Sequence, residues 1–486
     1  MRLLSVCLAA LVLAACSSSE GGGDDGPTAG QIPDKAGMTV KGIVKDSAGN
    51  GIAGVVVSDG LEVTATDERG IYYLASDLAR RNFVFVSVPA DCEIPATQGC
   101  PRFYRKIDRK QAVNRADFTL TRRKTPSDRH SLIVMADIQL AADNTSVDSY
   151  LGHVVPDVLK TVQGLPTEVY GVSLGDLVWN DMSLFPKYRQ GLETLGFTTF
   201  SLPGNHDPAE LTDSLALQSY ERYFGPANYS VNIGKIHYLF LDNILFDHAP
   251  TAEEEYTIGL TDEICRWIEA DLRYVPAGST LVVSSHCPIL YHTKNTAARN
   301  HRNFQRFLDA ISPYKVHAFG GHKHYHDIYR YDDGRKVMHC IARTPGDLFI
   351  NGDVNCDGTP RGYAVVEVDG ERLSWYYKPA GGKRDMQMRL YAPGRTNSAC
   401  VYANVWGYDT AWSAVEWIPA SGGQAVAMER TQRTDPYYEE VLATGVRGGT
   451  PTNTWHMFRV DPGSERGGMV RVTDSFGHTY ESSVSW

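Results

Sequence analysis

Residues 198–207 read TTFSLPGNHD, and this stretch decides the class of fold. Residues 198–203 form an uncharged, strand-forming run, and Gly204, Asn205, His206 and Asp207 come directly after it. The same form, an apolar run that ends in polar residues, recurs in SLIVMAD (131–137), EVYGVSLGD (168–176), LVVSSHCP (281–288) and KVHAFGGHKH (315–324). Unbroken apolar runs of this length are typical of strands that are buried on both faces, as in parallel sheets.

Segments with helical spacing separate these runs. Apolar residues recur every three or four positions in PKYRQGLETLG (186–196), LTDEICRWIEADLRYV (260–275) and RNFQRFLDAI (302–311). This alternation of strands and helices predicts an α/β layered domain, which we place at residues 123–384. Because functional residues in such folds gather at the carboxyl ends of strands, we expect the polar clusters to converge on one edge of the sheet.

The two flanking regions have a different pattern. Residues 37–122 and 385–486 show short apolar–polar alternation with Gly and Asp turns, which predicts an all-β sandwich domain on each side. No helical period appears in the first region, and no long helix is expected in the second. Residues 37–122 resemble a small carboxypeptidase-regulatory or transthyretin-like β-sandwich. In the second region Trp406, Trp412 and Trp417 lie close together in sequence and form either a sugar-stacking platform or a core contact.

The N-terminus resembles an export signal. Arg2 precedes an apolar run that is shorter than the roughly 20 residues of a transmembrane helix. Leu13-Ala14-Ala15-Cys16 resembles a bacterial lipobox, which implies a signal peptide over residues 1–15 and a lipidated Cys16. The N-terminal acyl groups would then hold the chain at a lipid bilayer of the cell envelope, for which we expect the outer membrane. The alternative is an ordinary secretory signal cut near Ala15.

Composition limits the remaining possibilities. The chain has 486 residues, which suits two to four domains, and residues 16–36, rich in Gly, Ser and acids, predict a flexible tether. Asp and Glu outnumber Lys and Arg by 57 to 47, so no nucleic-acid-binding surface is expected. Cys92 and Cys100 enclose a short loop and could form a disulfide in an oxidising compartment.

The five polar clusters, in this order, resemble the calcineurin-like metallophosphoesterase superfamily, whose pattern is D-x-H, G-D-x-x-D, G-N-H-D/E, H and G-H-x-H. The resemblance implies a phosphoesterase β-sandwich flanked by helices. Two positions depart from the pattern. Gln139 replaces the first His, as in a subgroup that carries Asp-x-Gln, and Trp179 replaces the second-motif Asp. Trp179 also argues against a purple acid phosphatase.

The resemblance implies a two-metal site for divalent ions such as Mn, Fe or Zn. His206 would act as general acid or electrostatic stabiliser, with Asp207 orienting its imidazole. Candidate substrate contacts are Arg361, His326 and Asn180. The first metal would be bound by Asp137, Gln139, Asp176 and His324, and the second by Asp176, Asn205, His286 and His322, with Asp176 bridging.

This site implies an exported enzyme, anchored by lipid, that hydrolyses phosphomonoesters or phosphodiesters. The nucleophile would be a hydroxide that bridges the two metals. The competing interpretation is a non-catalytic, glycan-binding surface lipoprotein on a phosphoesterase scaffold. A scaffold that had become inactive should have lost its charged ligands and His206 first. In this sequence only Gln139 differs from the family pattern of ligands. The sequence therefore favours the enzyme.

Overall fold

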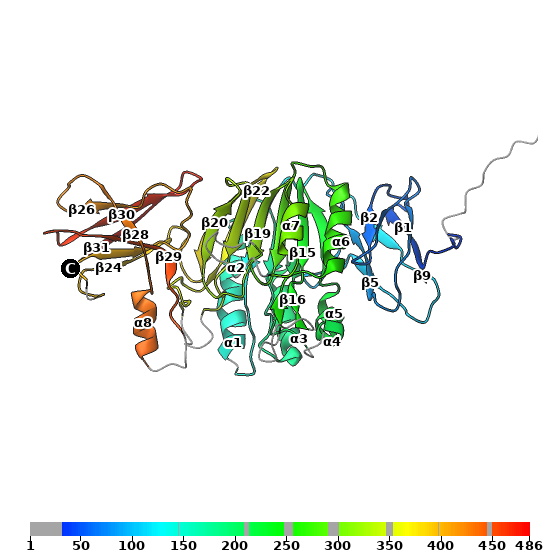
Figure 1. Ribbon diagram of the computed structural model, residues 1–486, viewed down its shortest axis with the longest axis horizontal. Helices are drawn as coiled ribbons and strands as arrows, with labels where there is room; N and C mark the ends of the chain where they lie inside the picture. Colours follow the sequence, from blue (N-terminus) through cyan, green and yellow to red (C-terminus); the bar gives the residue numbers. More distant parts are fainter. Residues whose placement is uncertain are drawn as a thin grey trace, which may run out of the picture.

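The computed structural model of the protein describes residues 32–143, 145–208, 213–246, 256–289, 301–346, 353–396, 398–444 and 450–486. These residues form a row of three parts: an N-terminal β domain, a central α/β domain and a C-terminal β domain (Figure 1). The predicted signal peptide, Cys16 and most of the predicted tether lie outside them. Within these ranges no helix is long and apolar enough to cross a membrane.

Two large sheets form the body of the central domain, which also has a short two-stranded sheet of β16 (Ile244–Leu245) and β17 (Thr257–Ile258). The first consists of β11 (Arg129–Met135), β12 (Glu168–Ser173), β13 (Thr199–Ser201), β22 (Gly362–Asp369) and β23 (Arg372–Pro379). The second consists of β14 (Tyr229–Ile233), β15 (Ile236–Leu241), β18 (Thr280–Ser285), β19 (Lys315–Gly320), β20 (Asp327–Tyr331) and β21 (Lys336–Cys340). Their strand orders are β13-β12-β11-β22-β23 and β14-β15-β18-β19-β21-β20.

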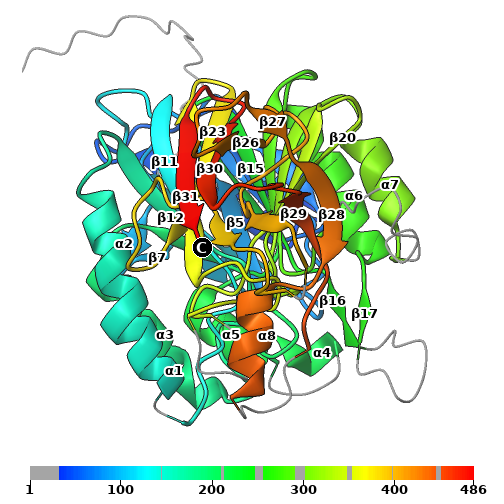
Figure 2. The same ribbon diagram turned by 90° about the vertical axis from the view of Figure 1, so that its left-hand side faces the viewer.

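Helices cover the outer faces of this sandwich, as the resemblance implied. The helices of the central domain are α1 (Thr145–Asp148), α2 (Val155–Val162), α3 (Phe185–Leu195), α4 (Asp213–Ala216), α5 (Gln218–Phe224), α6 (Asp262–Asp271) and α7 (Phe304–Ala310). In Figure 2, α1, α2 and α3 lie on one side of the sandwich, and α6 and α7 lie on the other. The fold class predicted from strand–helix alternation is confirmed.

Strand β11 explains the unbroken apolar runs. Leu132 and Val134 belong to the core between the two sheets, whereas Ile133 and Met135 belong to the core under α2 and α3. Both faces of the strand are therefore buried. β11 pairs in parallel with β12, and β12 with β13, while β15, β18, β19 and β21 are parallel neighbours in the other sheet.

The N-terminal domain has two four-stranded sheets, with the orders β10-β1-β4, with β9 beside β1, and β3-β2-β5-β8. It also has a short two-stranded sheet of β6 (Ala96–Thr97) and β7 (Cys100–Pro101). It packs directly on the central domain, since the ring of Phe85 meets that of Trp267 in α6 with centroids 6.1 Å apart. Its strands are β1 (Val40–Asp46), β2 (Val56–Ser58), β3 (Val63–Ala65), β4 (Ile71–Leu74), β5 (Phe83–Ser87), β8 (Tyr104–Lys106), β9 (Asn114–Arg115) and β10 (Phe118–Leu120).

The C-terminal domain also has two sheets, with the orders β24-β25-β29-β28 and β27-β26-β30-β31. It contains one helix that was not predicted, α8 (Pro436–Ala443). Asp435 accepts hydrogen bonds from the N–H groups of Tyr437 and Tyr438, and an Asp followed by Pro is a favourable helix start. The strands are β24 (Arg389–Tyr391), β25 (Val401–Asn404), β26 (Glu416–Pro419), β27 (Val426–Ala427), β28 (Glu429–Arg433), β29 (Thr454–Val460), β30 (Gly467–Thr473) and β31 (Thr479–Ser485).

Two expectations about side chains are resolved by burial. Cys92 and Cys100 are free thiols, so the predicted disulfide is wrong. Cys92 packs into the core between the sheets and Cys100 into the core under α3, which holds the two thiols in different clusters. Trp406 and Trp417 are buried, so they are core residues and not a platform for a sugar.

Candidate metal centre

The predicted ligands meet at one edge of the sandwich. They lie after the carboxyl ends of parallel strands: Asp137 and Gln139 after β11, Asp176 after β12, Asn205 after β13, His286 after β18, and His322 and His324 after β19. Contacts join residues from both sheets. His286 Nε2, for example, lies 2.9 Å from Asn205 Oδ1. The expected convergence of the polar clusters is therefore present in the structure.

The backbone at this edge adopts an uncommon conformation. A left-handed φ costs a non-glycine residue of order 1–3 kcal/mol, and such residues persist where surrounding contacts hold them, often at functional sites. Five of the predicted ligands have a left-handed φ angle: Asp137 (52°), Gln139 (49°), Asp176 (50°), His322 (66°) and His324 (54°).

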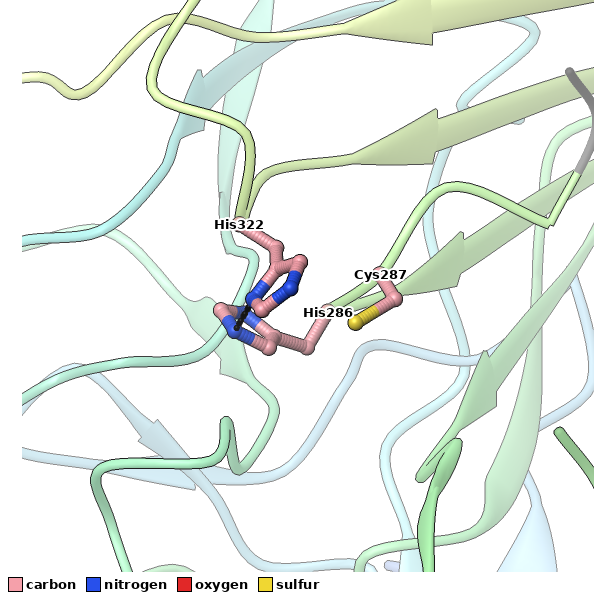
Figure 3. A group of neighbouring side chains, drawn as sticks. All are labelled: His286, Cys287 and His322. Carbon is pink, nitrogen blue, oxygen red and sulfur yellow. Dashed lines mark hydrogen bonds between the residues drawn. The ribbon is translucent and has the colours of Figure 1, made fainter. Parts of the chain in front are cut away.

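One group of donor atoms surrounds Asn205. Its Oδ1 lies 2.9 Å from His286 Nε2 and 2.9 Å from His322 Nδ1, and the two ring nitrogens are 3.2 Å apart. Figure 3 shows these two imidazoles reaching toward each other from neighbouring loops. With metal–ligand bonds of about 2.1 Å, neighbouring ligands of one cation lie roughly 3.0–3.4 Å apart. The spacing therefore fits a single divalent cation.

Cys287 is also within reach of this group but has another environment (Figure 3). It packs with the apolar residues Ala216, Ile244 and Phe246. Burial raises the pKa of its thiol well above the ordinary value, so the sulfur is protonated at neutral pH.

A second group of donors comprises Asp137, Asp176 and His324, whose ligand atoms all lie within 4.8 Å of one another. Asp137 Oδ1 is 3.5 Å from His324 Nε2, and both oxygens of Asp137 accept the backbone N–H of His322. Two carboxylates and an imidazole are suitable ligands for Mn, Fe or Zn. The residues present thus fit two divalent cations, one in each group.

Charge at the site favours cation binding. Burial lowers the pKa of His322, and the neighbouring His286 lowers it further, so His322 is neutral as a ligand must be. Burial also lowers the pKa of His286, but the carboxylates of Asp176 and Asp137 outweigh it and raise the pKa overall. The two carboxylates thus create a negative potential that a cation would neutralise.

Comparison of the sequence with protein families agrees with this geometry. Residues 131–326 match the calcineurin-like phosphoesterase family, residues 38–123 match the N terminal of calcineurin-like phosphoesterase, and residues 339–480 match its C terminal. The chain belongs to the calcineurin-like phosphoesterases. No curated protein matches the sequence.

Solved structures similar to this phosphoesterase include three with low sequence identity. A dimetal phosphatase from Danio rerio is 13% identical, over 51% of this chain and 96% of that one, with a TM-score of 0.38. A 5'-nucleotidase from Candida albicans is 11% identical over 51% and 50%, with a TM-score of 0.31. Vps29 complexed with Zn²⁺ from Entamoeba histolytica is 11% identical over 51% and 91%, with a TM-score of 0.27.

His206 of the phosphoesterase lies beside the predicted metal ligands. Its backbone N–H donates to Asp176 Oδ1 at 2.9 Å, and its ring stacks on Trp179. Asn180 Oδ1 is 2.9 Å from His206 Nδ1 and so accepts the Nδ1 proton. Burial lowers the pKa of His206, while the carboxylate of Asp176 partly opposes this effect. The predicted substrate contact Asn180 therefore orients the imidazole in this structure.

Asp207 has a different role from the predicted one. Its buried carboxylate accepts the backbone N–H groups of Leu177, Val178 and Gly204, at 2.8–3.1 Å. Asp207 therefore joins the turn after β12 to the turn after β13, and the prediction that it orients His206 is corrected. Burial and the nearby Asp176 raise the pKa of Asp207 to about 7.

The other two predicted substrate contacts lie apart from the donors. His326 is 1% exposed, with its ring 4.6 Å from that of Tyr377, so its burial contradicts a direct contact with substrate. Arg361 lines a cavity of about 270 Å³ with His153, Asp157 and Lys160, and none of the predicted ligands is among the described residues that line it.

Sequence reasoning missed Arg343. This buried residue comes after β21 and donates from Nε to Gln139 Oε1 at 2.7 Å. Arg343 follows an apolar strand, as the predicted ligands do, and this position could have indicated it. It belongs to no recurring motif of the sequence, however.

Proposed function

We propose that the protein is an exported, lipid-anchored phosphoesterase that hydrolyses phosphomonoesters or phosphodiesters at a two-metal centre. The observation that supports this most is the position of Asp176 between the two groups of donors. Its Oδ1 is 3.4 Å from His286 Nε2, while Asp137 and His324 complete the other group around the same carboxylate. A carboxylate shared in this way suits two cations that act on one phosphate.

When bound, two divalent cations would supply an activated water and neutralise charge on the phosphate. Asp137, Asp176 and His324 would hold one cation, and Asp176, Asn205, His286 and His322 the other. His206 would supply the proton to the leaving oxygen. Because Asn180 accepts the proton on Nδ1, the donated proton would come from Nε2 of the imidazolium.

Metal analysis tests the centre directly. Protein that lacks residues 1–16 should bind two divalent cations and hydrolyse aryl phosphate mono- or diesters. Asp176→Asn should abolish turnover and lower the bound metal, since it removes the shared carboxylate. Full turnover with two metals retained in this variant would refute the arrangement, and glycan binding without turnover in the parent would favour the glycan-binding lipoprotein.

The proposed location rests on Leu13-Ala14-Ala15-Cys16 and the polar residues after it. Acyl groups on Cys16 would anchor the domains to a bilayer of the cell envelope. Cys16→Ser should give an unlipidated protein that leaves the membrane fraction. Detergent-sensitive association with membranes in this variant would disprove the anchor.

A further inference from the structure

The side chain of Gln139 is held by a buried guanidinium. Arg343 donates from Nε to Gln139 Oε1 at 2.7 Å, and its other nitrogens donate to the backbone oxygens of Ile138, at 3.2 Å, and Gly346. Arg343 is 3% exposed and Gln139 is fully buried. These contacts fix the guanidinium against the turn after β11, next to Asp137 and Gln139.

This contact decides which end of the Gln139 amide faces the predicted metal ligands Asp176 and His324. A guanidinium only donates hydrogen bonds, so the atom that faces Arg343 must be the carbonyl oxygen. The Nε2 group then points at the ligands, 2.8 Å from Asp176 Oδ2 and 3.3 Å from His324 Nε2. Reversing the amide would place two donors face to face at the distance that now separates Arg343 Nε from Oε1.

We infer that Gln139 does not ligate the first metal but donates a hydrogen bond to Asp176, and that Arg343 is the positioning residue that holds it in this orientation. This inference rests on the proposed two-metal function. The first cation would then have three protein ligands, Asp137, Asp176 and His324, in place of the four that the family pattern implies.

Both contacts of the Gln139 amide lower the affinity of the first position for a metal ion. The donor on Asp176 Oδ2 competes with a cation for the same oxygen. Arg343 adds a positive charge in a buried environment, where charge interactions are strong, and because it contacts Gln139 this charge acts mainly on the position beside that residue. We therefore expect the two positions to bind metal with unequal affinity, the one beside Gln139 being weaker.

Binding of Mn²⁺ to the full-length protein, measured by electron paramagnetic resonance and calorimetry, tests this without reference to turnover. Arg343→Met should free the amide to turn its oxygen inward and tighten the weaker site by about tenfold or more, with the tighter site little changed. Arg343→Lys keeps a charged donor and is the matched control, expected to stay near the parent. Adding Gln139→Leu to Arg343→Met should give a smaller gain than Arg343→Met alone, because the amide oxygen that would ligate the metal is gone.

Gln139→Leu alone keeps the test decisive if Arg343→Met does not fold. It should leave the affinity of the weaker site unchanged or raise it, because no ligand is lost and the donor that competes for Asp176 Oδ2 is removed. A tenfold or larger loss in this variant, or no gain in Arg343→Met, would overturn the inference while leaving two metal sites in place. If the parent binds no Mn²⁺ at all, the two-metal function itself fails.

Discussion

The indole ring of Trp179 stacks on the imidazole of His206, with ring centroids 3.7 Å apart and planes inclined by 25°. The family pattern has an Asp at the position of Trp179. Here the carboxylate is replaced by an aromatic face that supports His206, while Asn180 holds Nδ1 of the same ring. His206 is thus held by stacking on one face of its ring and by a hydrogen bond at Nδ1. These contacts keep the imidazole beside Asp176, although His206 is not one of the predicted ligands.

Replacing His206 should separate chemistry from metal binding. His206→Ala removes a proton donor, and general acid catalysis contributes about 10²–10⁴-fold. Metal content should stay near that of the parent because every predicted ligand remains. The loss of kcat should be largest for an alkyl phosphate and smaller for nitrophenyl phosphate, whose leaving group needs little protonation.

Trp179→Phe provides the matched control, since it keeps an aromatic face under the imidazole and should retain most of the activity on both substrates. Equal losses on the two substrates in His206→Ala, or loss of metal together with activity, would show that His206 does something other than donate a proton.

The fully buried carboxylate of Asp207 accepts three backbone N–H groups, so its replacement should destabilise the turns at the site. Asp207→Asn replaces one acceptor oxygen with a donor, and a buried N–H left unpaired costs about 1–3 kcal/mol. We expect a lower free energy of unfolding in urea, with less bound metal, since the turns that carry Asp176 and Asn205 would separate. If Asp207→Asn instead keeps its bound metal and loses only general acid catalysis, Asp207 orients His206 as the sequence predicted.

His130 predicts how stability depends on pH. It is fully buried, with Nδ1 2.8 Å from the backbone oxygen of Ser127 and Nε2 2.5 Å from the hydroxyl of Tyr238, and burial lowers its pKa to about 4. The unfolded chain, in which the pKa of histidine is about 6.5, binds the proton first as pH falls. The stability that the neutral ring contributes is therefore present above about pH 6.5 and decreases toward pH 4.

The loss from this one residue should reach about 3 kcal/mol at most. Urea unfolding at several pH values between neutrality and the folded-state pKa measures it. His130→Gln offers a donor and an acceptor but does not titrate, so its stability should fall less steeply over this range. Parallel stability curves for the two proteins would mean that His130 does not contribute to the acid sensitivity.

The sequence allowed the central fold and the convergence of the polar clusters to be predicted for one physical reason. Unbroken apolar runs such as residues 132–135 form strands buried on both faces. Chain geometry places the polar residues at the ends of these strands along a common edge. That rule needs only local information, and it correctly located Asp137, Asp176 and His286 together.

The features that could not be predicted depend on contacts between distant residues. Asp207 accepts hydrogen bonds from backbone groups of residues 177 and 178, and Arg343 reaches Gln139 from the segment that follows β21 of the other sheet. No regular spacing of residues in the sequence indicates either contact. The disulfide between Cys92 and Cys100 failed for the same reason, because proximity in sequence did not reveal that each thiol belongs to a different core.

The C-terminal domain contacts the segment after His324 through His456. His456 Nδ1 lies 2.6 Å from Asn404 Oδ1, and its Nε2 lies 3.3 Å from the buried carboxylate of Asp357. Asp357 in turn accepts the backbone N–H of His326 at 2.9 Å, two residues beyond His324. The C-terminal domain thus helps to hold the turn that carries His324, a predicted metal ligand.

His456→Leu should leave these buried acceptors with fewer partners, which costs about 1–3 kcal/mol, and should weaken metal binding at the position that uses His324. Unfolding in urea and Mn²⁺ titration measure the two effects. His478→Leu is the control in the same domain: its half-exposed ring pairs with Asp474, and surface changes usually alter stability by less than about 0.5 kcal/mol. If His456→Leu keeps both the stability and the metal affinity of the parent, the C-terminal domain does not support the metal centre.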